Sequence, residues 1–296
     1  MIENHRPAGG NAPLTQILFV CQGGKLEYQS LLLAMSIRKH ARFNHRMTAK
    51  IPRPAPGIEY PSERTVRLLQ DYGVSIDEFD NDLVRQHNSS RLALLLTNKI
   101  FCLSTSTDAR LTLFLDSDTI LKNTLDQKDI FTDHLILRDI GYAGASIISQ
   151  WLHQLEQVFQ FRFPEHQIQL VRPKRPTIHA PQLFNSSLIG IPTERVDSLK
   201  TAWLENYSTL WSMALTPPEP YQKEQASFAI TVHQSGLEYD TSPGALSMGF
   251  DHYSKVLHTK PKVKKTILEL LAEQPNVASH FARLPNWKSL LKFEGI

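Results

Sequence analysis

Two aspartates separated by one residue are the strongest sign of chemistry in this sequence. Asp116 and Asp118 lie in the stretch LFLDSDTIL, between two apolar runs. On an extended backbone residues i and i+2 share a face, so the two carboxylates point to the same side. Such a pair could hold a divalent cation, include the nucleophile of a phosphatase, or form a solvated turn at the end of a strand. Like charges held this close favour a hard cation, and the flanking apolar runs argue against the solvated turn.

The chain ahead of the aspartates alternates strand and helix patterns, which predicts an α/β fold with a largely parallel sheet. The turn Gln22-Gly23-Gly24 follows the first apolar run, and Ile51–Gly57 is predicted to be a loop because its three prolines fix φ and remove donors. The expected elements are strands at Ile17–Val20, Val74–Phe79 and Leu111–Leu115 and helices at Tyr28–His40, Ser62–Asp71 and Arg91–Leu103.

The second half of the chain is predicted to add one strand and several helices. The strand is Phe184–Ile191, Arg172–Pro176 is expected to be a loop, and Pro285 is expected to break the last helix. The expected helices are Trp151–Phe161, Thr193–Trp211, Glu224–Gly236, Lys262–Gln274 and Asn276–Phe293.

Composition narrows the class of protein. With 296 residues, 41% hydrophobic and 21% charged, the chain can bury a large core. Its net charge of +3 argues against a nucleic-acid binder. Cys21 and Cys102 lie in apolar segments, as expected of buried free thiols. We find no secretion signal and no apolar run long enough to span a membrane, so we expect a cytoplasmic protein with a disordered tail over residues 1–14.

The glycine turn and the aspartates are predicted to share one site. Each follows the carboxyl end of an expected strand, where open α/β sheets bind their ligands. Gly23 would let the backbone come close to such a ligand, although it could equally be a plain turn glycine.

These motifs resemble the GT-A glycosyltransferases, and their order is most similar to the glycogenin-like and bacterial galactosyltransferase branch. The likeness covers roughly residues 15 to 265 and rests on the motifs that follow. They are the aspartate pair preceded by Asn98-Lys99-Ile100, the first strand with its glycine turn and a helix ending in Ser36-Ile37-Arg38, Phe184-Asn185-Ser186-Ser187, Glu224-Gln225, and Val256-Leu257-His258 with Lys260-Pro261. The sequence departs from the family pattern at Ser187, which replaces a glycine, and around His258, whose motif is shorter than usual.

The resemblance implies a Rossmann-like mixed, mostly parallel sheet flanked by helices, with further helices at the C-terminal end. It implies a nucleotide-sugar donor, UDP being the expected carrier, and a divalent cation, Mn²⁺ or Mg²⁺, bound by Asp116, Asp118 and His258. His252 competes with His258 for the place of third ligand. The donor would be bound by Gly23, Gly24, Lys99, Asp116, Ser117 and Lys260, and the catalytic residues would be Glu224 and Asn185.

The expected enzyme is a hexosyltransferase that uses a glycan or lipid-linked acceptor. We assign residues 15–262 to the transferase domain and 263–296 to a helical extension packed on it. A basic cluster between residues 255 and 265 either contacts an anionic membrane surface or is a solvated face.

Two alternatives stay open at this point. One is a non-catalytic nucleotide-sugar-binding or adaptor protein of the same fold. The other is a haloacid-dehalogenase-type phosphatase, which fits poorly because Ile120 replaces the expected Thr or Val and the chain has no Asp-Asp dipeptide.

Overall fold

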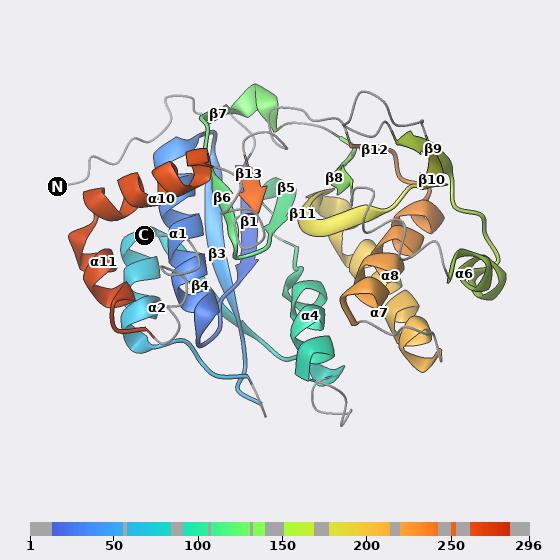
Figure 1. Cartoon of the computed structure of the whole chain (residues 1–296), viewed down its shortest axis with the longest axis horizontal. Coiled ribbons are helices and arrows are strands. Elements are labelled where there is room, and N and C mark those ends of the chain that lie inside the picture. Colours follow the sequence, from blue (N-terminus) through green and yellow to red (C-terminus); the bar gives the residue numbers. More distant parts are fainter. Residues whose placement is uncertain are drawn as a thin grey trace.

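The computed structural model describes residues 14–55, 58–83, 91–105, 108–130, 133–139, 151–168, 178–213, 220–241, 250–252 and 261–284. Its centre is a seven-stranded sheet, shown in Figure 1. The strands of this sheet are β1 (Leu14–Val20), β3 (His45–Pro52), β4 (Val74–Phe79), β5 (Ala109–Leu115), β8 (Leu135–Asp139), β11 (Phe184–Pro192) and β12 (Tyr239–Asp240). They lie in the order β12-β8-β11-β5-β1-β3-β4, and β11 alone runs antiparallel to both of its neighbours.

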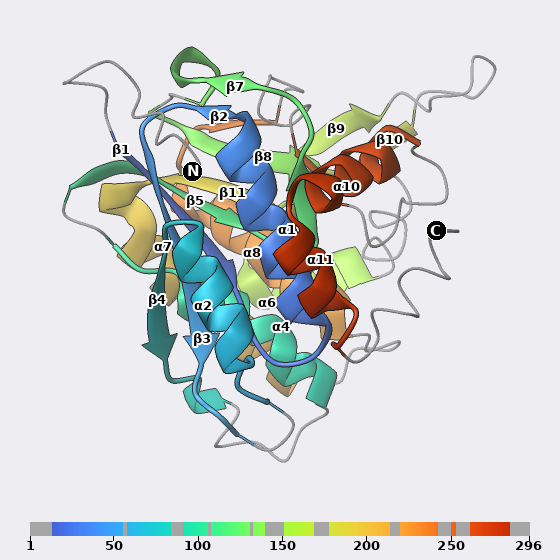
Figure 2. The same cartoon turned by 90° about the vertical axis from the view of Figure 1, so that its left-hand side faces the viewer.

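Helices cover the sheet on both faces (Figure 1). One face carries α1 (Lys25–His40), α2 (Glu63–Asp71), α10 (Pro261–Glu273) and α11 (Pro275–Phe281), which Figure 2 shows from their own side. The other face carries α4 (Arg91–Cys102), α7 (Val196–Ser212) and α8 (Pro220–Ser235). The remaining elements are α6 (Leu152–Phe159), the 3₁₀ turns η1 (Gln127–Asp129) and η3 (Thr193–Arg195), and the short strand pairs β2 (Ala41–Arg42) with β7 (Leu125–Asp126), β6 (Thr119–Leu121) with β13 (Phe250–His252), and β9 (Glu165–Ile168) with β10 (Ile178–Pro181).

The core consists of two layers, one on each face of the sheet. In β1, Ile17 and Phe19 join the layer beneath α1, whereas Leu18 and Val20 join the layer beneath α4 and α8. This alternation explains the unbroken apolar run Ile17–Val20 in β1, since a strand segment buried on both faces favours apolar residues at each position. The predicted α/β fold with a mostly parallel sheet is therefore confirmed.

The C-terminal helices contribute to the same core as the first helix. Ile267 and Leu270 of α10 and Val277 and Phe281 of α11 are buried in the layer that contains α1. The Phe281 ring also meets Tyr28 of α1 edge-on, with 6.1 Å between centroids. Of the helices in the described ranges, none has the length and apolar character needed to cross a membrane.

Several sequence-based boundaries were wrong. Ile51 and Pro52 are the last residues of β3 and not part of a loop, and no strand had been predicted over His45–Pro52. The predicted helix at Glu224 begins four residues earlier, at Pro220, where the first turn tolerates a residue without an N–H. Helix α11 ends at Phe281, before Pro285. Arg172–Pro176 lies outside the described residues.

Candidate active site

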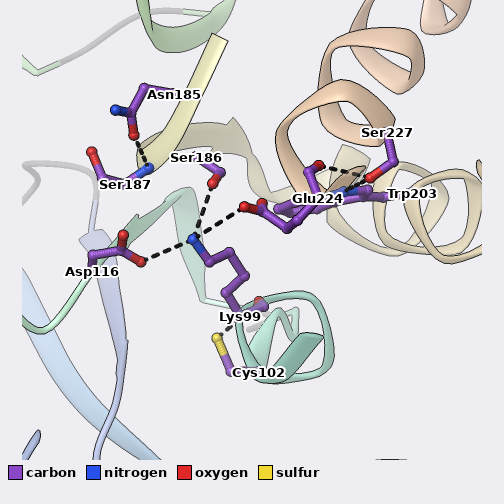
Figure 3. A network of polar contacts seen from close by, with 9 residues as sticks. All are labelled: Lys99, Cys102, Asp116, Asn185, Ser186, Ser187, Trp203, Glu224 and Ser227. Atoms are coloured by element: carbon purple, nitrogen blue, oxygen red, sulfur yellow. Dashed lines mark hydrogen bonds and ion pairs between the residues drawn. The ribbon is translucent and has the colours of Figure 1, made fainter. Parts of the chain in front are cut away.

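Several of the predicted site residues come together where β5 ends and β11 begins. Strand β5 ends at Leu115, directly before Asp116. Because β11 is antiparallel to β5, its first residues, including Asn185 and Ser186, lie at this same edge of the sheet. Helices α4 and α8 bring Lys99 and Glu224 to it, as Figure 3 shows. Residues more than a hundred positions apart therefore form one polar cluster.

The aspartate motif forms a tight turn that is anchored on both sides. The Asp116 N–H donates to the Ser187 carbonyl over 2.9 Å, and the Thr119 N–H donates to the Asp116 carbonyl over 2.9 Å. The buried Ser117 hydroxyl donates to the carbonyl of Val20, at the end of β1. Asp116 and Asp118, on either side of it, are only partly buried. The turn therefore fixes Ser117 inward, and a contact between Ser117 and a donor stays a prediction.

Lys99 is at the centre of the cluster (Figure 3). Its Nζ lies 3.3 Å from Asp116 Oδ1, 3.6 Å from Glu224 Oε2 and 3.0 Å from Ser186 Oγ, to which it donates a hydrogen bond. The side chains of Lys99 and Glu224 are 11% and 1% exposed, whereas that of Asp116 is 25% exposed. One ammonium group thus connects β5, β11 and α8, and it holds a fully buried carboxylate near one that reaches solvent.

The pKa shifts in this cluster reflect a balance between burial and opposite charges. Burial opposes the ammonium form of Lys99, yet Asp116 and Glu224 outweigh burial and raise the pKa of Lys99 above its usual value. Burial also raises the pKa of Glu224, and Lys99 and Ser186 only partly offset this. Lys99 therefore faces both Asp116 and Glu224, and Asp118 is also close enough to act on it.

One carboxylate oxygen of Glu224 has no partner in the described part of the chain. Its Oε1 is buried and has no hydrogen-bond partner among the residues that the structure describes. The backbone of Glu224 is held firmly, because its carbonyl accepts from Ser227 over 2.7 Å and Ser227 in turn accepts from Trp203 Nε1 over 3.0 Å. Glu224 lies in the second turn of α8, so it does not act as a first-turn acid that stabilises the start of this helix. A buried, unpaired carboxylate oxygen is costly and is found most often at functional sites.

The glycine turn after β1 is held in place by the chain itself. The Gly23 N–H donates to the Glu59 carbonyl over 2.7 Å, and a Cβ at Gly23 would come within 2.7 Å of Glu59 Cβ. Gly24 has φ +85, which favours glycine. Gln22, just before them, accepts from Asn98 Nδ2 over 3.2 Å. Gly23 is therefore required by the close approach of residue 59, and its contact with a nucleotide stays a prediction.

Two of the residues that organise the cluster had been given no role from the sequence. Ser186 receives the Lys99 hydrogen bond, and Asn81 donates to Asn98 Oδ1 over 2.8 Å, which fixes the residue beside Lys99. Asn185, predicted to be catalytic, accepts from the Ser187 N–H over 2.9 Å through its own side chain. The only sequence signal for Ser186 was its place in the FNSS stretch, and nothing local marked Asn81.

A divalent cation fits the residues around the aspartate turn. The oxygens of Asp116 and Asp118 are hard ligands of the kind that Mg²⁺ and Mn²⁺ prefer, and both carboxylates act on Lys99. Within the described ranges no group of three or more His, Cys, Asp or Glu side chains could hold a metal by itself. His258 and Lys260 lie outside the described residues. The backbone of His252 pairs with Thr119, the residue after Asp118.

Comparison with known proteins assigns the chain to a protein family. The sequence pattern of the Rhodobacterales glycosyltransferase domain matches residues 17–236, which include the glycine turn, Lys99, the aspartates and Glu224. No curated protein matches the chain. The apo structure of the bifunctional glycosyltransferase WbbM is similar, with a TM-score of 0.52 and 13% sequence identity over 97% of this chain. The chain spans 52% of the length of WbbM. It therefore belongs to the Rhodobacterales glycosyltransferase domain family and is a glycosyltransferase with a GT-A-like fold.

Proposed function

We propose that the chain transfers a hexosyl group from a nucleotide-sugar donor, a UDP-sugar, to a hydroxyl group of a glycan or glycolipid with the help of a divalent cation. The observation that carries the proposal is the Lys99 cluster, in which one ammonium group lies between Asp116 and Glu224 at the carboxyl edge of the sheet. Ligands of open α/β sheets bind at this edge.

Lys99 and the aspartates would act on the departing diphosphate. Breaking the bond between sugar and phosphate leaves negative charge on the diphosphate, and preorganised positive charge stabilises it. Mn²⁺ or Mg²⁺ bound by Asp116 and Asp118 would supply most of this charge as a Lewis acid. Lys99 holds Asp116 in place through the 3.3 Å contact and adds a second positive charge nearby. Lys260, when it reaches the phosphates, would add a third.

Glu224 would act on the acceptor. Its unpaired Oε1 can accept a hydrogen bond from an incoming hydroxyl group, and Lys99 stabilises its ionised form through Oε2. If the sugar is transferred with inversion, Glu224 takes the acceptor proton as a general base. If the configuration is retained, Glu224 orients the acceptor. Asn185, at the start of β11, would bind a sugar hydroxyl.

For the third metal ligand, the strand pairing favours His252. Its backbone lies beside Thr119, one residue from Asp118, whereas His258 lies outside the described residues. Titration of Mn²⁺ into His252→Ala and His258→Ala would separate the two. The variant that lacks a metal ligand should bind Mn²⁺ more weakly than the wild type, and the variant that keeps all ligands should bind it equally well.

If the acceptor is lipid-linked, the basic cluster of residues 255–265 would bring the chain to an anionic membrane surface. Lys265, in α10, is exposed. Its Nζ lies 3.8 Å from Glu269 Oε1, so this neighbouring carboxylate partly offsets the positive charge of Lys265. Sedimentation with phosphatidylserine vesicles and with neutral vesicles tests the membrane contact. Binding to neither kind of vesicle contradicts it.

Release of the free nucleoside diphosphate tests the function itself. The protein is incubated with UDP-glucose, UDP-galactose or UDP-N-acetylglucosamine, with Mn²⁺ and with EDTA, and with a panel of glycan acceptors. We expect UDP release that depends on the metal and is lost in Asp118→Asn. Binding of the donors without any release would support the non-catalytic alternative. The phosphatase alternative has no support in the family match.

A further inference from the structure

A second buried carboxylate, that of Glu27, is hydrogen-bonded to the glycine turn. Glu27 lies in the first turn of α1, three residues after Gly24, and is 5% exposed. Its Oε1 accepts from the Gly24 N–H over 3.2 Å. Its Oε2 accepts from the Ser62 N–H over 2.9 Å and from the hydroxyls of Ser62 and Thr65, each over 2.6 Å. The carboxylate therefore joins the turn to the start of α2.

The network continues from Thr65 to the C-terminal helix α11. Thr65 Oγ1 lies 2.8 Å from His280 Nε2. Because the Thr65 hydroxyl gives its proton to Glu27, its oxygen must accept from His280, which assigns the proton of the imidazole to Nε2. Burial lowers the pKa of His280, an effect that Glu27 opposes, so the neutral ring is favoured in this position. The hydrogen-bonded path runs from Gly24 through Glu27 and Thr65 to His280.

Packing holds helix α11 in a defined position, so that its hydrogen bond to Thr65 can help to position Glu27. Phe281, next to His280, is fully buried and packs edge-on against Tyr28, next to Glu27. Two adjacent pairs of residues thus connect α11 to the first turn of α1, one pair through ring contact and the other through Thr65. Helix α11 is thus connected to the glycine turn through Thr65 and Glu27, and it can influence the turn without contacting a ligand itself.

We infer that Glu27 is a positioning residue for the nucleotide-binding turn and that α11 holds Glu27 in place through His280 and Thr65. The inference rests on the proposed function, since it assumes that Gly23 and Gly24 face the nucleotide. It differs from a purely structural explanation, in which Glu27 only caps α1. A cap contributes to stability alone, whereas a positioning residue also sets the affinity for the nucleotide.

Calorimetric titration with nucleoside diphosphates separates the two explanations. UDP, GDP, ADP and CDP are each titrated with Mn²⁺ into the wild type, and the tightest binder is then used as the probe. The variants are Thr65→Val, which replaces the hydroxyl by a methyl group of similar shape, His280→Ala, and His280→Gln, whose amide N–H can reach Thr65. Asn206→Ala is the control, since Asn206 joins α7 to α8 through Thr231 and Gln234. Melting temperatures are recorded for all four variants.

We expect Thr65→Val and His280→Ala each to weaken binding of the probe about fivefold, the scale of one lost hydrogen bond. The affinities of His280→Gln and Asn206→Ala for the probe should stay within about twofold of the wild-type affinity, a difference smaller than the effect of one hydrogen bond. This should hold even where their melting temperatures fall. If the wild type binds the probe and both Thr65→Val and His280→Ala bind it equally well, the inference is overturned and the proposed function stands. If the wild type binds none of the four nucleotides, the proposed function falls and this inference falls with it. If His280→Ala does not fold, Thr65→Val alone decides.

Discussion

Glu27 and Glu224 are both buried glutamates near the carboxyl ends of the strands of the central sheet, but the groups that surround them differ. Four hydrogen-bond donors surround the Glu27 carboxylate and use both of its oxygens. Glu224 has one oxygen 3.6 Å from Lys99 and another without a partner in the described part of the chain. A satisfied buried network fixes structure, whereas an unsatisfied group is tolerated where a ligand completes it. The comparison assigns positioning to Glu27 and chemistry to Glu224.

The largest effect is expected from Lys99→Met, which removes the cation from the cluster. Glu224 would stay buried without its partner, so we expect the free energy of unfolding to fall by about 3–5 kcal/mol. We also expect UDP release to fall by about 10²–10³-fold, since a preorganised charge is lost. Urea denaturation and the release assay measure the two effects. Lys223→Met is the matched control, because Lys223 is also buried but donates to the Met213 carbonyl. A Lys99 variant with full turnover would contradict the central role of this residue.

Glu224→Gln is expected to separate activity from stability. The amide keeps the shape of the side chain but cannot accept a proton. If Glu224 is the general base, we expect UDP release to fall by about 10²–10⁴-fold, the range of a lost general base. The variant also removes a buried charge, and the melting temperature should therefore stay the same or rise. An unfolding temperature well below that of the wild type, with turnover unchanged, would mean that Glu224 is a structural residue.

Glu27→Gln is expected to give the opposite pattern. The amide group keeps one acceptor and replaces the other by a donor, which leaves Gly24 or Ser62 unpaired and lowers the free energy of unfolding by about 1–3 kcal/mol. We expect kcat to change by less than about threefold, a range below the effect of a lost catalytic group, while KM for the donor rises. Steady-state kinetics of the two glutamine variants side by side measures this difference. Equal losses of kcat in both would remove the distinction between the two carboxylates.

The smallest effect is a pH dependence that should run in opposite directions for activity and stability. The pKa of Glu224 is raised above its usual value of 4.5, mainly by burial. The folded state therefore favours the protonated acid, so the stabilising contribution of Glu224 is complete below pH 4.5 and is lost as the pH rises through the raised pKa. Activity that needs the carboxylate rises with pH over the same range. In Glu224→Gln both slopes should disappear, and a pH–rate profile unchanged by this substitution would assign the slope to another group.

The parts of the fold that were predictable are those with strong local signals. Strands β1, β5 and β11 are apolar because they are buried in the middle of the sheet, and each had been predicted from that pattern. Strand β3 was missed because Lys50 lies at its buried end, where it forms an ion pair with Asp77 of β4. A partner on another strand makes a buried lysine acceptable, and no local pattern shows it.

The candidate site was predictable in its residue types but not in its connections. The aspartates were recognisable from their spacing, and Lys99 and Glu224 from the family resemblance. That Lys99 contacts both Asp116 and Glu224 depends on how α4 and α8 pack against β5, which is long-range information. The network from Glu27 to His280 was not predicted at all, because it joins residues 253 positions apart through one intermediate residue, Thr65.

The central claim is that sugar transfer depends on the metal and on the cluster of Lys99, Asp116 and Glu224. Its most direct test is the rate of UDP release from the UDP-sugars, measured at the same pH for the wild type, Asp118→Asn and Glu224→Gln, with Mn²⁺ and with EDTA. We predict release by the wild type with Mn²⁺ only and a loss of at least about 100-fold in each variant, with all three proteins folded. Release that continues in EDTA and in Asp118→Asn at the wild-type rate would contradict the account.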